Sequence, residues 1–128
     1  MNELTITAKE FFTKYRTTFD KGDMKEFSTF FNEPFMSVRA DGQIQSLPTN
    51  KDAELFFPQV IDIWKNEGYK SFTMCDFEVI KLGSSSVLVT FTWEMLDNNA
   101  DLIRQWRQSY NLVKNVDEWK VILSTFHR

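Results

Sequence analysis

The sequence predicts an α+β fold in which three N-terminal helices pack against a curled antiparallel sheet and enclose a pocket with it. Two observations carry this prediction. Apolar residues recur at helical spacing up to about Gly68 and at alternate positions from there on. The 128 residues also include 13 Phe and 4 Trp, which supply enough large apolar surface for the core of a single domain over residues 1–128.

The first helix is predicted from an aromatic stripe that ends near Gly22. Thr7 and Glu10 have the spacing of a capping box, so we expect the helix to begin there. Gly22 suits the left-handed residue that follows many helices. The stripe consists of residues at helical spacing, namely Ala8, Phe12, Tyr15 and Phe19, with Phe11 beside them.

A short second helix and a strand pair follow. Asp23 suits an N-cap, and the helix must end before Pro34 because the residue preceding a proline avoids helical geometry. Asp41-Gly42 predicts a tight turn whose two central residues have positive φ. The strands on either side of this turn are the segments FMSVRA and QIQSL.

The third helix is expected to be capped by Thr49 or Asn50 and closed by Gly68. Pro58 interrupts its pattern. Because proline lacks a backbone donor and clashes with the preceding turn, we expect a kink or a restart near Phe57. The apolar residues at helical spacing are Ala53, Phe56, Phe57, Val60 and Trp64.

Four long strands complete the chain, and the turns between them are short. Short turns join neighbouring strands in antiparallel pairs. The predicted strands are Tyr69–Leu82, Val87–Leu96, Leu102–Val113 and Trp119–His127.

Even-length hairpin loops pair odd-numbered positions with even ones, and this rule predicts which side chains share a face. The last three strands then place one apolar and aromatic set together: Val89, Phe91, Trp93, Trp106, Gln108, Tyr110, Trp119, Val121, Leu123, Thr125 and His127. The outer set is Thr90, Thr92, Gln105, Arg107, Ser109 and Asn111. Because Tyr15 lies in the helix stripe that covers the apolar face, the predicted pocket residues are Tyr15, Trp93, Trp106, Tyr110 and His127. The tyrosine hydroxyls and His127 are its main polar groups.

The strand after Gly68 allows two registers. One places Phe72, Met74, Asp76 and Glu78 on the apolar face, and the other places Thr73, Cys75, Phe77 and Val79 there. Packing favours the second set, because buried carboxylates without cationic partners are costly. The same cost raises the pKa of a catalytic carboxylate, which keeps Asp76 as a candidate.

Composition excludes several classes of partner and site. A net charge of -3 with interspersed signs offers no surface for nucleic acid, and no apolar stretch is long enough for a membrane span. A single cysteine, Cys75, forms no internal disulfide, and a cytoplasmic protein is expected. One His and one Cys are too few for an ordinary zinc site, and no glycine-rich loop is present to cradle a phosphate, so we expect no metal and no cofactor.

The order helix, short helix, hairpin, long helix and four long strands resembles the NTF2-like superfamily over nearly the whole chain. That superfamily, with its SnoaL-like and ketosteroid-isomerase-like members, scytalone dehydratase and polyketide cyclases, has a cone-shaped fold. Four segments look like a bacterial branch of it, namely FNEPFMSVRADG, LPTNKDAELFFPQV, NEGY and WKVILSTFH.

The enzymatic relatives imply a carboxylate general base on the strand after the second helix. This sequence departs there, because residues 35–40 include no carboxylate. Arg39 could anchor an anionic ligand but could not abstract a proton, since a guanidinium stays protonated.

Two functions are therefore carried forward. The first is a noncatalytic or weakly catalytic module that binds a small apolar molecule, as a homodimer through the outer face of the sheet. The second is a lyase or isomerase acting on a small cyclic substrate, with acid-base chemistry supplied by Asp76, Tyr15, Tyr110 or His127. An acid inside the cavity beside a tyrosine favours the second, and a cavity without one favours the first.

Overall fold

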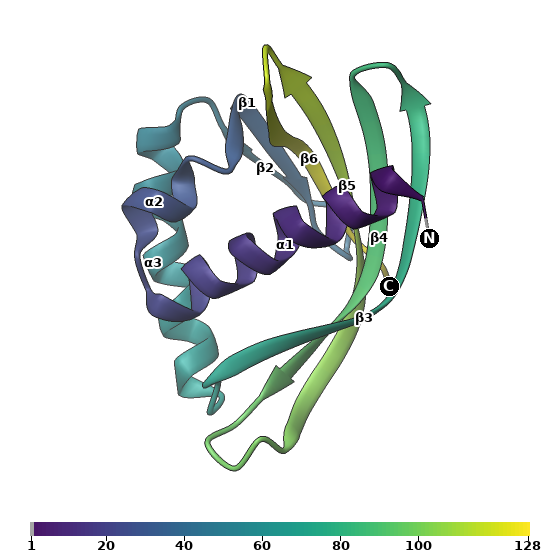
Figure 1. The fold of residues 1–128 in the computed structure, drawn as a ribbon. Helices are drawn as coiled ribbons and strands as arrows, with labels where there is room; N and C mark the ends of the chain where they lie inside the picture. The colour runs from purple at the N-terminus through teal and green to yellow at the C-terminus, as the bar shows by residue number, and fades with distance from the viewer. Residues whose placement is uncertain (1) are drawn as a thin grey trace.

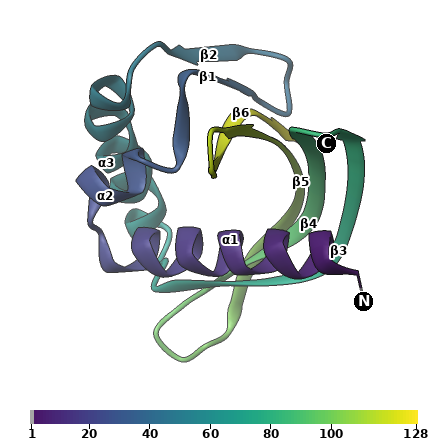
Figure 2. The same ribbon diagram turned by 45° about the horizontal axis from the view of Figure 1, so that its top comes forward.

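The computed structural model describes residues 2–128, in which helices come first and long strands last, as the change of period predicts. Figures 1 and 2 show a sheet that curls to one side, with α1 running across its concave face and α2 and α3 beside the β1–β2 end. The elements are α1 (Glu3–Lys21), α2 (Met24–Ser28), β1 (Phe31–Val38), β2 (Ile44–Leu47), α3 (Asn50–Asn66), β3 (Ser71–Gly83), β4 (Ser86–Leu96), β5 (Leu102–Asn115) and β6 (Glu118–Phe126).

The sheet has the strand order β2-β1-β6-β5-β4-β3. The hairpins that join β3 to β6 are antiparallel, as predicted from their short turns. The β1–β6 pair is parallel, so a fully antiparallel sheet is wrong and the sheet is mixed. No short turn fixes the relative direction of these two strands, because most of the chain lies between them. Only the packing of the β1–β2 hairpin beside β6 decides it.

The helix ends follow their caps. The Asn2 side chain accepts a hydrogen bond from the Thr5 amide (2.8 Å), so α1 begins at Glu3 and the start expected at Thr7 is wrong. A single Asn before the first turn suffices to cap a helix, which leaves Thr7 inside it. Gly22 ends α1 in the left-handed conformation (φ 77°), and Asp23 caps α2 by accepting from the Glu26 amide, both as predicted.

The third helix carries a complete capping box between Thr49 and Asp52 and runs unbroken through Pro58, so a restart near Phe57 is wrong. Proline costs this helix one backbone hydrogen bond. Its aromatic face offsets that cost, because the Phe57 ring stacks on Phe31 with 5.0 Å between centroids and burial of such rings stabilises strongly.

The β1–β2 turn is wider than a two-residue turn. The Arg39 amide donates to the Gln43 carbonyl and the Gly42 amide donates to the Arg39 carbonyl, each at 2.8 Å. Gly42 has a positive φ of 90° and Asp41 does not, so the predicted pair of positive φ values is wrong. Three residues lie between the paired positions, and such loops need only one left-handed residue.

The predicted register holds for β4 and β5 and fails in part for β6. Trp93 pairs with Trp106, and Val89 with Tyr110, which places these side chains on one face. The β4–β5 loop has five residues, so the expected even length is wrong there, and the register shift between Met95 and Leu96 restores the predicted parity. The β5–β6 loop has two residues, but β6 contains one extra residue at Ile122, where the register shifts. A bulge of this kind turns the rest of the strand over. Ser124 and Phe126 therefore face the concave side, and the predictions that placed Leu123, Thr125 and His127 there are wrong.

A second bulge lies in β3, and the strand follows one of the two expected registers before it and the other register after it. Phe72 and Met74 pair with Met95 and Trp93 before the bulge, and Val79 pairs with Val89 after it. Asp76 lies in the bulge with φ 58°. After the bulge, Phe77 stacks on Phe91 at 4.6 Å. Asp76 and Glu78 are both exposed, and Glu78 bonds Arg107 on the outer face.

The concave face and the helices share one aromatic core, in which Phe12, Phe27, Phe31 and Phe91 are almost completely buried. Within residues 2–128, no helix combines the length and the apolar character that a membrane span requires.

Candidate functional site

A cavity of about 330 Å³ lies between the concave face of the sheet and the helices. This volume falls in the range of small-molecule sites. Every helix and every strand contributes to its wall: Tyr15, Arg16, Phe19, Phe27, Phe35, Ser37, Arg39, Ala40, Gln45, Phe56, Phe57, Val60, Ile63, Trp64, Phe72, Trp93, Arg104, Trp106, Gln108, Tyr110, Ser124, Phe126 and His127.

All five predicted pocket residues line this cavity, and Tyr15, Trp93, Trp106 and Tyr110 belong to the aromatic core or pack against it. His127 borders it and is exposed, but its imidazole belongs to the outer face. There His127 Nε2 lies 2.7 Å from the Ser109 hydroxyl, which in turn lies 2.7 Å from the Thr90 hydroxyl.

The inner end of the cavity is aromatic, and its polar atoms are paired with one another. Trp93 Nε1 donates to the Tyr110 hydroxyl at 2.8 Å. The Tyr15 ring stacks on Trp93 with 6.1 Å between centroids. Burial raises the pKa of Tyr15 well above its ordinary value, and the neighbouring Tyr110 raises it further. Burial also raises the pKa of Tyr110. Both phenols therefore stay neutral over the physiological range and serve as hydrogen-bonding groups.

A row of polar side chains crosses four strands toward the β1–β2 end. Gln45 pairs with Ser37, Ser37 with Ser124, and Ser124 with Tyr110, so all four lie side by side on the concave face. The Ser124 hydroxyl donates to the Ser37 hydroxyl at 3.3 Å. Two residues before Tyr110 on β5, Gln108 Oε1 accepts a hydrogen bond from Trp106 Nε1 at 3.0 Å.

The charges on the cavity wall have one sign. Three arginines line it, and none of the described residues that line it carries a carboxyl group. Arg104 is paired outside the cavity, because its Nε lies 3.0 Å from Glu67, and its guanidinium lies 4.6 Å from the Trp106 ring centre. Arg39, which follows β1 on the same face as Ser37, forms no ion pair with any residue in 2–128.

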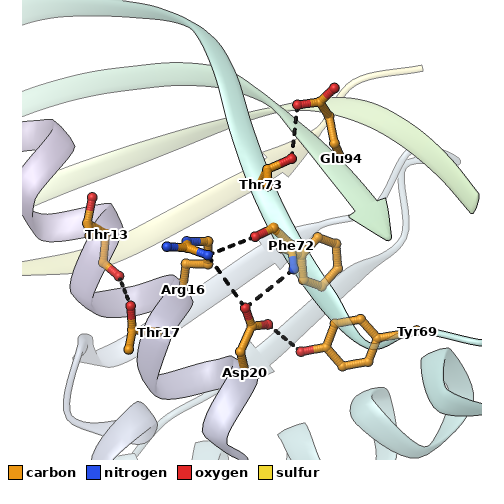
Figure 3. A network of polar contacts seen from close by, with 8 residues as sticks. All are labelled: Thr13, Arg16, Thr17, Asp20, Tyr69, Phe72, Thr73 and Glu94. Carbon is orange, nitrogen blue, oxygen red and sulfur yellow. Dashed lines mark hydrogen bonds and ion pairs between the residues drawn. The ribbon is translucent and has the colours of Figure 1, made fainter. Parts of the chain in front are cut away.

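Arg16 belongs to a network that fixes α1 against the start of β3 (Figure 3). Its Nη1 donates to the Phe72 carbonyl at 3.0 Å and lies 3.8 Å from Asp20. Asp20 accepts from the Tyr69 hydroxyl at 2.5 Å and from the Phe72 amide at 3.4 Å. Burial raises the pKa of Asp20, although these two hydrogen bonds and Arg16 oppose the shift. The network holds Phe72, a wall residue, in place.

No group of three His, Cys, Asp or Glu side chains that could hold a metal ion occurs within residues 2–128. Sequence reasoning placed Gln108 on the apolar face and recognised Arg39 as an anion anchor. It missed Ser37, Gln45 and Ser124. Ser37 and Arg39 lie two and four positions after the buried Phe35, and this spacing predicts that all three share one face of a strand. The facing of Ser124 depends on the bulge at Ile122, which the sequence does not reveal.

Solved structures of similar fold cover almost the whole chain. Aln2 from a Streptomyces species has a TM-score of 0.79 at 12% identity, covering 100% of this chain and 92% of that one. An NTF-2 like protein of unknown function from Shewanella oneidensis has a TM-score of 0.76 at 13% identity, with 97% and 98% covered. A protein from Catenulispora Acidiphila in complex with S-DNPA has a TM-score of 0.74 at 8% identity, with 96% and 92% covered. At these identities the likeness shows the fold alone.

Sequence comparison gives a match over the same length. The model of the family described as NTF2-like protein (DUF6841) matches residues 2–128. No curated protein matches the chain.

Proposed function

Because the chain belongs to the NTF2-like family DUF6841, we propose that it binds a small, largely apolar molecule in the cavity on the concave face of its sheet. The observation that carries this proposal is the composition of the wall. Its inner end is made of aromatic rings, where Trp93 bonds Tyr110, and polar side chains gather at the other end. An apolar site with a few placed polar groups is typical of small-molecule binding.

The position of the carboxylates favours binding over the lyase or isomerase alternative. A general base must reach the proton that it abstracts, and carboxylates are the bases that the enzymatic relatives imply. Among residues 2–128, none that lines the cavity is acidic, and Asp76 and Glu78 are exposed. The raised pKa values of Tyr15 and Tyr110 also make these phenols poor bases.

A fold neighbour supports the use of this architecture for small molecules. The protein from Catenulispora Acidiphila was solved in complex with S-DNPA, and it shares the fold of this chain at 8% identity. This relationship supports a ligand site in the fold and leaves the ligand of this chain to be identified by experiment.

A neutral fluorescent probe tests the proposal. N-phenyl-1-naphthylamine fluoresces more strongly in an apolar site, and we expect a saturable rise with the intact protein. Val60→Trp should abolish the rise because it fills the cavity from α3. Ile6→Trp, on the exposed side of α1, is the matched control and should retain it. No saturable rise with a folded protein, or equal binding by Val60→Trp, would contradict the proposal.

Two further parts of the proposal concern the protein in the cell. We propose a homodimer formed through the outer face of the sheet, on the basis of the fold resemblance and the mixed polar surface there. We also propose a cytoplasmic location, where the single Cys75 would stay a thiol. Fractionation of the source cells tests the location.

A further inference from the structure

The geometry points to a ligand that carries a carboxylate, with its apolar body among the aromatic rings and its acid group at the polar end beside Arg39 and Gln108. This inference rests on the proposed function, because it requires that the cavity be a binding site. It adds the chemical class of the ligand and the direction in which the ligand lies.

The first observation is the charge of the wall. The whole chain has a net charge of -3, yet the described residues that line the cavity include three arginines and no acid. Guanidinium groups stay protonated at all physiological pH values. The site therefore attracts an anion and repels a cation.

The second observation is that only one of the three guanidinium groups lacks an ion pair within residues 2–128. Arg16 is held by the Phe72 carbonyl and Asp20, and Arg104 by Glu67. Arg39 has neither an ion pair nor a side-chain hydrogen bond to a described residue. Because a guanidinium presents paired donors that match a carboxylate, Arg39 is the group that can take one.

The third observation is a side-chain donor of a buried residue, Gln108, that opens into the cavity. Gln108 is 4% exposed, and its Oε1 accepts from Trp106 Nε1. This bond fixes the orientation of the amide, because an indole nitrogen only donates. Gln108 Nε2 thus keeps two N–H donors that no described residue accepts. No enclosed side-chain nitrogen or oxygen within residues 2–128 lacks a partner, so this nitrogen must open into the cavity.

Arg39, Ser37 and Gln108 lie on the same face of the sheet, on or directly after strands that are separated only by β6. Ser37 pairs with Ser124, and Arg39 follows two positions after Ser37 on the same face. Gln108 pairs with Phe126, two positions after Ser124. When Ser124 donates to Ser37, the Ser37 hydroxyl proton is free for the ligand. One charge and several donors thus converge at one end of an otherwise apolar cavity.

A matched pair of probes tests the inference. Naphthalene-2-acetate and naphthalene-2-acetamide have the same apolar body and differ in the charge of the head group. By calorimetry we expect the acid to bind about tenfold more tightly than the amide, the scale of a hydrogen bond to a charged group. Raising the salt concentration should weaken binding of the acid and not of the amide.

Two variants locate the acid group. Arg39→Gln should weaken binding of the acid about tenfold and change the affinity for the amide by less than about twofold. Lys14→Gln removes the same charge from an exposed part of α1 that does not line the cavity, and it should change neither. Gln108→Glu keeps an acceptor for Trp106 but replaces the Nε2 donor by a carboxylate oxygen, so it should abolish binding of the acid in a protein that circular dichroism shows to be folded.

The results separate this inference from the proposed function. If N-phenyl-1-naphthylamine binds and the wild-type protein does not prefer the acid, the carboxylate inference is overturned and the apolar site stands. Equal weakening of acid and amide by Arg39→Gln also overturns it. If none of the three probes binds, the proposed function itself fails.

Discussion

The indole Nε1 of Trp93 donates a hydrogen bond of 2.8 Å to the hydroxyl of Tyr110, across the pair formed by β4 and β5. Both residues are at least nine-tenths buried, at 5% and 3% exposure. Their polar atoms satisfy each other at the aromatic end of the cavity, where no charged side chain is needed. This pairing leaves hydrogen bonding with a ligand to the polar side chains at the other end.

Tyr110→Phe should lower the free energy of unfolding by about 1 to 3 kcal/mol, because it leaves the buried Trp93 Nε1 without an acceptor. Urea denaturation measures the change. A double-mutant cycle with Trp93→Phe isolates the hydrogen bond, since the second substitution should cost less when Tyr110 is already Phe. Fully additive losses would contradict the coupling.

Trp106→Ala should weaken binding of N-phenyl-1-naphthylamine by about 1 to 3 kcal/mol, the scale for the loss of a large buried side chain from a binding wall. Trp119→Ala removes an indole that lies outside the cavity wall and serves as the control. Fluorescence titration measures both. An unchanged affinity in a folded Trp106→Ala protein would remove this residue from the site.

The Asp20 carboxyl should contribute more to the free energy of unfolding at low pH than at neutral pH. Because burial raises its pKa in the folded state, the folded protein holds this proton more tightly than the unfolded chain does. The stabilisation is complete below the ordinary pKa of aspartate and is lost as the pH rises through the folded pKa.

The free energy of unfolding of the wild type minus that of Asp20→Asn should therefore be larger at about pH 3 than at about pH 7. Urea denaturation across this range measures the difference. Asp62→Asn, which removes an exposed carboxyl from α3, controls for the change in net charge. A difference that grows with pH would show that the hydrogen bonds from Tyr69 and Phe72 outweigh burial.

Light scattering at micromolar concentration should give twice the chain mass of 15.2 kDa. Leu88→Arg should return the protein to a monomer, because Leu88 lies on the outer face between Ile80 and Asn111. Leu55→Arg, at an exposed position of α3, is the matched control and should leave the dimer intact. A wild-type monomer would rule out the proposed assembly.

The sequence by itself determined the order of the elements and the alternation of side chains along the two central strands. The period of apolar residues separates the helices from the strands near Gly68, and the alternation along β4 and β5 places Trp93, Trp106 and Tyr110 on one face. The order and the alternation are local, because they follow from the geometry of each element. The facing of β5 against β4 also depends on the register shift between Met95 and Leu96, which offsets a loop of five residues.

Tertiary structure alone decided where that alternation breaks. The extra residue at Ile122 turns His127 outward and brings Ser124 into the cavity, and the bulge at Asp76 keeps Asp76 and Glu78 outside it. The parallel pairing of β1 with β6 places Ser37 and Arg39 on the same face as Gln108, with β6 between them. Bulges and the pairing of distant strands depend on how a sheet curls to cover its core, so a linear pattern of residue types does not specify them.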